Sequence, residues 1–158
     1  MRKLLAVALA GIALVTACSF SSQSLTVGTA TVDPTYSCPP GSTNAAYDVH
    51  GTVALHNPSS SAVTIKAVTA EMTLEATQGT WSEKVGDRYN AGSAKFTPAT
   101  VAGGGSTTLE VTIPSACTNG KAGNAGKSYG DYKVTLSIAT SAGTFTAASS
   151  NLHRIVAA

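Results

Sequence analysis

The stretch Tyr132-Lys133-Val134-Thr135-Leu136-Ser137-Ile138 decides the fold. Its apolar residues occupy every second position, and its polar residues occupy the positions between them. Because successive side chains of a β-strand point to opposite faces, this pattern predicts a strand with one buried face and one solvated face. The rest of the chain must therefore supply further strands that cover the buried face.

The same alternation recurs along the chain, with turns rich in Gly and Pro between the segments. The expected strands cover residues 25–32, 47–55, 63–74, 95–101, 109–113, 132–138 and a last segment from residue 144. A change of phase near Ala67-Val68 predicts a β-bulge. Pro98 suits an edge strand, and Pro114 is expected to end the strand before it. About seven strands and no amphipathic helix of useful length predict an all-β sandwich.

The N-terminus carries an independent signal. Arg2 and Lys3 precede an apolar and small-residue run over 4–17, the anatomy of a secretory signal peptide. The run ends in Val15-Thr16-Ala17-Cys18, which resembles the lipobox of bacterial lipoproteins: an aliphatic residue, a small residue, Ala and then Cys. The resemblance implies cleavage before Cys18 and a lipid on its sulfur. The alternative is an ordinary secretory signal that leaves a free cysteine.

The lipobox interpretation divides the chain into three parts. Residues 1–17 are the signal peptide, residues 18–24 are the lipidated cysteine and a short polar linker, and residues 25–158 are one domain. Six linker residues reach about 20 Å when extended, so the domain is expected close to the membrane. We expect a lipid-anchored protein on the extracytoplasmic face of a bacterial membrane, at the cell surface or in the periplasm.

A second resemblance concerns the fold. Gly130-Asp131-Tyr132-Lys133-Val134-Thr135-Leu136 resembles the Gly-x-Tyr-x-Val-x-Leu strand of bacterial Ig-like and fibronectin-III-like domains. Residues 101–106, followed by Leu109-Glu110-Val111, resemble the turn and strand before it. The resemblance implies a seven-stranded antiparallel Ig-like sandwich. It also implies that Tyr132 stands where the chain enters its strand, with its hydroxyl bonded to upstream backbone.

The three cysteines are an odd number for a secreted chain. If Cys18 carries lipid, Cys38 and Cys117 remain as candidates for a disulfide in an oxidising compartment. Both are expected in loops at the same end of the Ig-like sandwich, unlike the intersheet pair of antibody domains. A bridge there closes a loop of about 80 residues and stabilises the fold by roughly 4–5 kcal/mol in the chain-entropy model. The alternative is two unpaired thiols.

Composition and motifs give little support to catalysis or nucleic-acid binding. Charged residues make up 11% of the chain, and without Arg2 and Lys3 the bases equal the acids. Gly126-Lys127-Ser128-Tyr129-Gly130 matches the Gly-x-Ser-x-Gly nucleophile elbow, but an elbow lies between a strand and a helix, and here a strand follows. Gly126-Lys127-Ser128 also resembles the end of a phosphate-binding loop, which needs Gly where Lys121 stands. We therefore expect no catalytic residue.

The histidines and acids also lack the spacing of a metal or hydrolytic site. His50 and His56 share a strand face about 20 Å apart, and His153 stands alone near the C-terminus. Glu71 and Glu75 share a face about 13 Å apart, farther than the paired carboxylates of glycosidases. We expect no metal and no cofactor.

The expected function is that of a non-catalytic binding or structural module. The alternative is a small secreted enzyme, or a metal or ligand carrier, with a site built from loops. Residues 36–46, 78–92 and 118–128 are expected at the membrane-distal end, where the disulfide ties the first of these segments to the third. The second of these segments holds Trp81, Arg88 and Tyr89, residue types that are rich in interface hot spots, which predicts a protein partner there. Alternatively, Trp81 closes the edge of the core.

Overall fold

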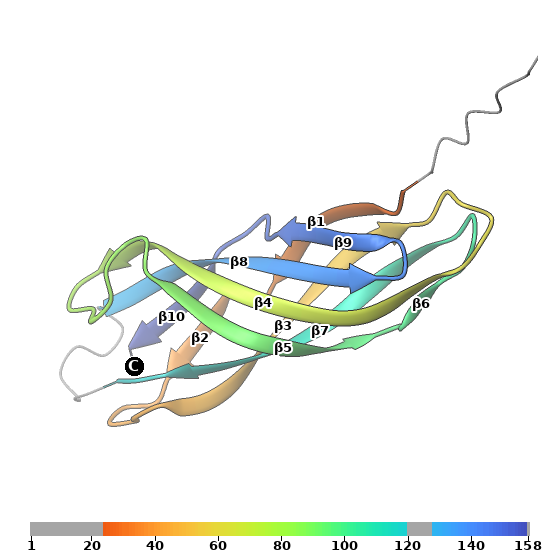
Figure 1. The fold of residues 1–158 in the computed structure, drawn as a ribbon. Helices are drawn as coiled ribbons and strands as arrows, with labels where there is room; N and C mark the ends of the chain where they lie inside the picture. Colours follow the sequence, from red (N-terminus) through yellow and green to blue (C-terminus); the bar gives the residue numbers. More distant parts are fainter. Residues whose placement is uncertain (1–23, 120–127, 158) are drawn as a thin grey trace, which may run out of the picture.

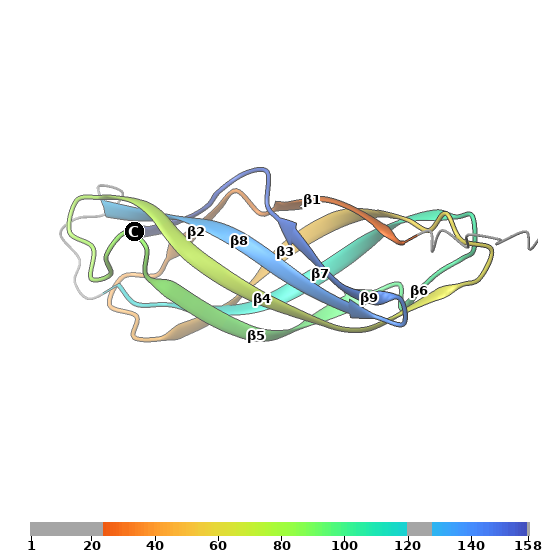
Figure 2. The same ribbon diagram turned by 45° about the horizontal axis from the view of Figure 1, so that its top comes forward.

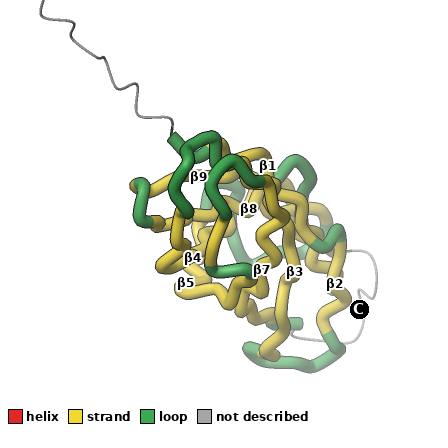
Figure 3. Tube along the Cα trace, turned by 90° about the vertical axis from the view of Figure 1, so that its right-hand side faces the viewer, coloured by secondary structure: helices red, strands yellow, loops and turns green. Residues whose placement is uncertain are grey.

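The computed structural model describes residues 24–119 and 128–157, which form strands and connections but no helix (Figure 3). The strands are β1 (Thr26–Val32), β2 (Thr35–Cys38), β3 (Ala45–His56), β4 (Val63–Gln78), β5 (Arg88–Thr97), β6 (Thr100–Val101), β7 (Ser106–Cys117), β8 (Ser128–Thr140), β9 (Gly143–Ala148) and β10 (His153–Ala157). In this part of the chain, no helix is long and apolar enough to cross a membrane. The predicted all-β class is confirmed.

The strands form two layers that enclose a core (Figures 1 and 2). One layer consists of β1, β3, β7 and the end of β5, and the other of β4, β8, β9, β10, β2 and the start of β5. β5 joins them, because its residues 88–94 pair with β4 and its residues 95–97 pair with β7. The architecture is therefore the predicted β-sandwich, with one strand shared between the layers.

The chain also changes layer between β1 and β2. β1 pairs with β3 in the first layer, whereas β2 runs parallel to β10 in the second. The crossing is at Asp33-Pro34. There the Asp33 N–H donates to the His50 carbonyl at 2.9 Å, and the Asp33 carboxylate accepts the His50 N–H at 2.9 Å. These two bonds hold the crossing against β3. On either side of it, β1 lies toward one end of the sandwich and β2 toward the other (Figure 1).

The buried positions follow the alternation seen in the sequence. Val134, Leu136 and Ile138 of β8 are fully buried, as are Val49, Val53 and Leu55 of β3. On β4 the buried side chains change from odd to even numbers after Ile65, and the pairing with β8 is irregular between Ile65 and Ala67. The predicted bulge is confirmed, because one extra residue is needed to keep both halves of β4 facing the core.

The sequence underestimated the number of strands, since the described residues form ten strands where about seven were expected. The segment 36–46 was expected to be a loop, but its start is β2, and the C-terminal residues form β10. β2 has four residues and is held by parallel pairing with β10, 119 residues away at Arg154↔Thr35. A strand that short has no alternation long enough to detect, and its partner is not local in sequence.

The two proline expectations have different outcomes. The segment 95–101 is divided in two: residues 95–97 end β5 and pair only with β7, and Thr100–Val101 form β6 and pair only with β4. Pro98 lies between them, and each part has one unpaired side, as expected of an edge. Pro114 does not end its strand, because β7 continues to Cys117. β5 pairs with β7 only at residues 110–112, so Pro114 has a strand neighbour on one side, at Asp48, and its missing N–H is tolerated on the other.

Candidate functional site

The candidate site lies at what we call the distal end, the end of the sandwich opposite the first residue of β1. In Figure 1 the start of β1 is on the right, and the connections β2–β3 and β4–β5 are on the left. A cleft of about 200 Å³ opens there. The distal cleft is lined by Asn44, Trp81, Ser82, Glu83, Tyr89, Ala116, Cys117, Thr118, Tyr132 and Ile155. It therefore combines residues from all three segments that were expected at this end.

A disulfide between Cys38 and Cys117 forms the base of the distal end. The sulfur atoms are 2.09 Å apart and the Cα atoms 6.0 Å apart, and both residues are buried. The predicted pairing is confirmed, but the expected placement in loops is wrong. Cys38 ends β2 and Cys117 ends β7, so the bond joins the two layers. The sequence pattern did not indicate β2, and β7 is longer than the expected strand over 109–113.

Hydrogen bonds extend this connection between the first and third segments. The Asn119 side chain donates to the Cys38 carbonyl at 3.0 Å, and its N–H donates to the Ser42 carbonyl at 2.9 Å. The Asn44 N–H donates to the Thr118 hydroxyl at 3.1 Å. The start of the segment 118–128 is thus fixed to the β2–β3 connection, whereas residues 120–127 lie outside the described residues.

Trp81 lies over β8. A Cβ added at Gly130 would come within 2.7 Å of the indole, so the ring rests on the glycine backbone. The indole Nε1–H donates to the Tyr132 hydroxyl at 3.2 Å and, at 3.4 Å, to the Glu83 carboxylate. Trp81 is partly buried and packs against the core, as the core-edge alternative expected, yet it also lines the cleft.

The Tyr132 hydroxyl has partners that differ from the Ig-type expectation. It donates to the Glu83 carboxylate and accepts from the Trp81 indole. Its partners are therefore two side chains of the β4–β5 connection, whereas the Ig-like resemblance implied a bond to upstream backbone. Burial, followed by the bond to Glu83, raises the pKa of Tyr132 far above its usual value. The β4–β5 connection lies over the start of β8 and places Trp81 and Glu83 at this hydroxyl.

The other two candidate binding residues lie at the start of β5 and not in the loop expected over 78–92, and their side chains separate. Tyr89 pairs with buried Met72, so its ring points to the side between the layers, and it remains 40% exposed at the cleft. Arg88 forms an ion pair with Glu71 at 3.4 Å, with both side chains exposed, and does not line the cleft. The structure therefore groups Trp81 and Tyr89 and places Arg88 beside them.

Sequence reasoning missed an aromatic cluster behind the cleft. Tyr36 stacks on Tyr47 with ring centroids 3.8 Å apart, and the Tyr47 hydroxyl lies 3.1 Å from His153 Nε2. His153 is buried, and its Nδ1 lies 2.7 Å from the Asp33 carbonyl, which requires a proton on Nδ1 and makes Nε2 the acceptor. Burial lowers the pKa of His153 and raises that of Tyr47 to about 12. The alternation over 47–55 places Tyr47 on the buried face with Val49, but nothing local indicates the burial of His153.

The candidate catalytic motif has a structural role. Ser128 is buried at the start of β8, and its hydroxyl accepts the Thr80 N–H at 3.0 Å. Gly126 and Lys127 lie outside the described residues. The Ser128 hydroxyl therefore links β8 to the β4–β5 connection. β8 contains the strand that the sequence predicted over 132–138.

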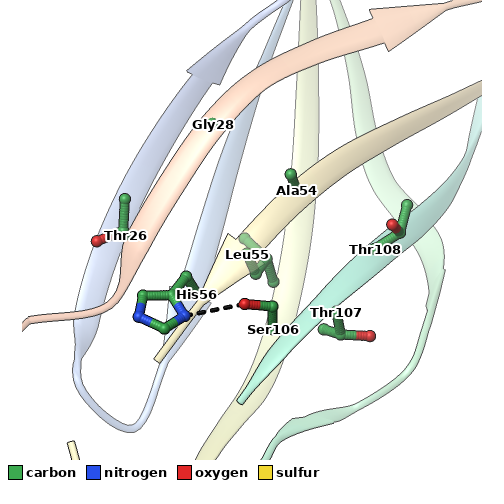
Figure 4. A pocket seen from close by; sticks show the side chains of 8 residues that line it. All are labelled: Thr26, Gly28, Ala54, Leu55, His56, Ser106, Thr107 and Thr108. Atoms are coloured by element: carbon green, nitrogen blue, oxygen red, sulfur yellow. Dashed lines mark hydrogen bonds between the residues drawn. The ribbon is translucent and has the colours of Figure 1, made fainter. Parts of the chain in front are cut away.

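The remaining histidines lie on the outer face of the first layer. His50 Nδ1 is 3.0 Å from the Asp33 carboxylate, and His56 Nδ1 is 2.9 Å from the Ser106 hydroxyl. Figure 4 shows His56 beside an open depression of about 420 Å³ between β1, β3 and β7, in which Gly28 and Ala54 leave space. Across residues 24–119 and 128–157, no three His, Cys, Asp or Glu side chains are grouped to hold a metal ion.

Comparisons with known proteins give weak likenesses. No protein-family model and no curated protein matches the chain. The ASH/PapD-like domain 7 of human CEP192 is similar in structure at 10% identity and a TM-score of 0.39, over 100% of this chain and 98% of that one. AggA, the major subunit of aggregative adherence fimbriae type I from Escherichia coli, has 10% identity and a TM-score of 0.37, over 84% and 94%. A putative late embryogenesis abundant protein has 18% identity and a TM-score of 0.40, over 83% and 71%. Likeness at this level says nothing about what the chain binds.

Proposed function

We propose that this chain is a lipid-anchored, non-catalytic β-sandwich that presents a binding surface on the extracytoplasmic face of a bacterial membrane. The observation that carries the proposal is the distal end. Segments from three parts of the sequence meet there, a buried disulfide joins the two layers beneath them, and a cleft opens between them. Such a rigid platform loses little conformational entropy when a partner binds.

The anchoring half of the proposal rests on the N-terminal sequence. Cys18 follows the lipobox-like residues 15–17 and lies outside the described residues. β1 begins at Thr26, at the end opposite the distal cleft (Figure 1). A lipid on Cys18 and a short linker would hold that end near the membrane and direct the cleft away from it. Two or more acyl chains anchor a protein stably.

Binding is preferred to catalysis because reactive groups near the cleft are engaged in structural bonds. The Ser128 hydroxyl accepts a backbone N–H, and both His153 nitrogens are occupied by Asp33 and Tyr47. A nucleophile and its base need to lie within hydrogen-bond reach of each other and to be open to substrate. These two buried groups are instead used to fix β8 and β10.

Metabolic labelling with an alkyne analogue of palmitate tests the anchor. We expect the wild-type chain to incorporate the label and to partition with membranes, and Cys18→Ser to do neither. A photo-crosslinking residue at exposed Ser82, in the cleft, tests the binding surface against one at exposed Thr108, at the opposite end. Label that persists in Cys18→Ser contradicts the anchor, and crosslinks that are equal at both positions contradict the distal surface.

A further inference from the structure

We propose that the distal cleft binds a cationic group, an ammonium or a guanidinium, between Trp81 and Tyr89 and beside the Glu83 carboxylate. The inference deepens the proposed function and rests on it, because it assigns a ligand chemistry to the same cleft. The two remain separable, since binding of a small cation can be measured whether or not the chain carries a lipid.

Aromatic side chains supply the first part of the argument. Trp81, Tyr89 and Tyr132 all line the cleft, although apolar aliphatic residues dominate the rest of the core. Tyr89 is 40% exposed while its ring points to the side between the layers, so part of the ring borders the cleft. The electron-rich faces of such rings attract cations, and Trp attracts them most strongly.

Charge supplies the second part. Glu83 is the one charged residue among those that line the distal cleft. Its Oε2 accepts from Tyr132 and Trp81, which holds the carboxylate in place, whereas Oε1 has no hydrogen-bond partner among the described residues. The nearby guanidinium of Arg88 pairs with Glu71 outside the cleft. Within the described part of the chain, the negative charge of Glu83 therefore lacks a cationic partner.

The same two features disfavour other ligands. An anion would be repelled by Glu83, and a neutral ligand that covers the cleft would remove water from a carboxylate without replacing it, which costs free energy. A cation compensates that charge and contacts the rings at the same time. The volume of about 200 Å³ suits a single head group with part of its stem.

Fluorescence provides a direct test, because Trp81 is the only Trp in the chain. The full chain, purified in a neutral detergent, is titrated with tetramethylammonium, N-acetyl-lysine amide and N-acetyl-arginine amide. N-acetyl-norleucine amide serves as the uncharged control. We expect saturable changes with the cations, weakened by added salt, and none with the control. Equal changes with the uncharged probe contradict the inference.

Glu83→Gln is the decisive variant, because it keeps the size and a hydrogen-bond acceptor for Tyr132 and removes the charge. We expect roughly tenfold weaker binding of each cation, the usual scale for loss of one charge-assisted contact. Glu75 is exposed on β4 and lies outside the cleft, so Glu75→Gln is the matched control and should bind cations as the wild type does. Far-UV circular dichroism confirms that both variants fold. Wild-type affinity in folded Glu83→Gln overturns the inference.

The source of the cation follows from the same titrations. If a short peptide with one Lys or Arg binds more tightly than the capped amino acid, the natural ligand is a basic side chain of a protein partner. If tetramethylammonium alone matches the best peptide, the ligand is a quaternary ammonium head group. Both results support a cation site. If the wild-type chain incorporates no palmitate analogue but the purified chain still binds cations, the result contradicts the lipid anchor and leaves the cation site standing.

Discussion

The two halves of the core are built from different side chains. The half near the start of β1 is mainly aliphatic, with Val53 and Leu109 paired across β3 and β7, and the aromatic side chains that pack there, Phe96 and Phe145, carry no polar group. The distal half also contains buried aliphatic side chains, but it adds the hydrogen-bonding rings of Tyr36, Tyr47, Trp81, Tyr132 and His153. Aliphatic groups need complete burial, whereas hydrogen-bonded aromatic groups tolerate an edge that faces water. This difference allows a cleft to open at one end.

The connections at the two ends show the same contrast. At the end near the start of β1, buried Asn57 donates to the carbonyls of Ser61, Val101 and Ala102 and closes the turn. A Cβ at Gly103 would lie 2.2 Å from the Ser60 carbonyl oxygen, so these two turns are in close contact. The distal connections are held by a disulfide and side-chain bonds around open space. The turns near the start of β1 therefore contact each other directly, whereas the distal connections border a cleft.

The largest effect is expected in the aliphatic half. Leu109→Ala removes a fully buried side chain and should lower the free energy of unfolding by about 2–5 kcal/mol, through lost transfer free energy and a new cavity. Urea unfolding followed by circular dichroism measures the loss. Thr108→Ala, exposed on the same strand, should change stability by less than about 0.5 kcal/mol. Equal losses in the two variants would show that the first layer does not bury this face.

A smaller effect, specific to the distal half, is expected for Gly130→Ala. The new methyl group would meet the Trp81 ring at 2.7 Å, so the ring must move. Such overpacking costs about 1–3 kcal/mol, and the displaced indole should show a red-shifted emission. In a Trp81→Ala background the same substitution should cost much less, which a double-mutant cycle measures. Additive losses would mean that the indole does not rest on Gly130.

The smallest effect is expected from pH and concerns His153. Because burial lowers its pKa in the folded chain, the unfolded chain takes up a proton first as pH falls below about 6.5, and stability is lost through that window. We expect the free energy of unfolding to decrease as the pH falls below that value. His153→Gln should remove this part of the slope, and exposed His56→Gln should leave it unchanged. A slope that persists in His153→Gln would assign it to other groups.

The sequence was most informative where a pattern is local and periodic. The strict alternation over 132–138 and 47–55 predicted β8 and β3 and their buried faces, and the phase change at Ala67-Val68 predicted the bulge of β4. Cysteine number and compartment predicted the bond between Cys38 and Cys117. β2 and β10 escaped prediction because both are short and are held by pairing: β2 pairs with β10, across most of the chain, and β10 also pairs with β8.

The same distinction between local patterns and distant contacts applies to the candidate site. The sequence by itself determined that the chain is all-β and which faces of its long strands are buried, because these depend on neighbouring residues. Only the tertiary structure decided that Trp81 rests on Gly130, that Tyr132 binds Glu83, and that His153 is buried. Those contacts join residues about 50 or more positions apart, and the pairing of β4, β8 and β10 brings them together.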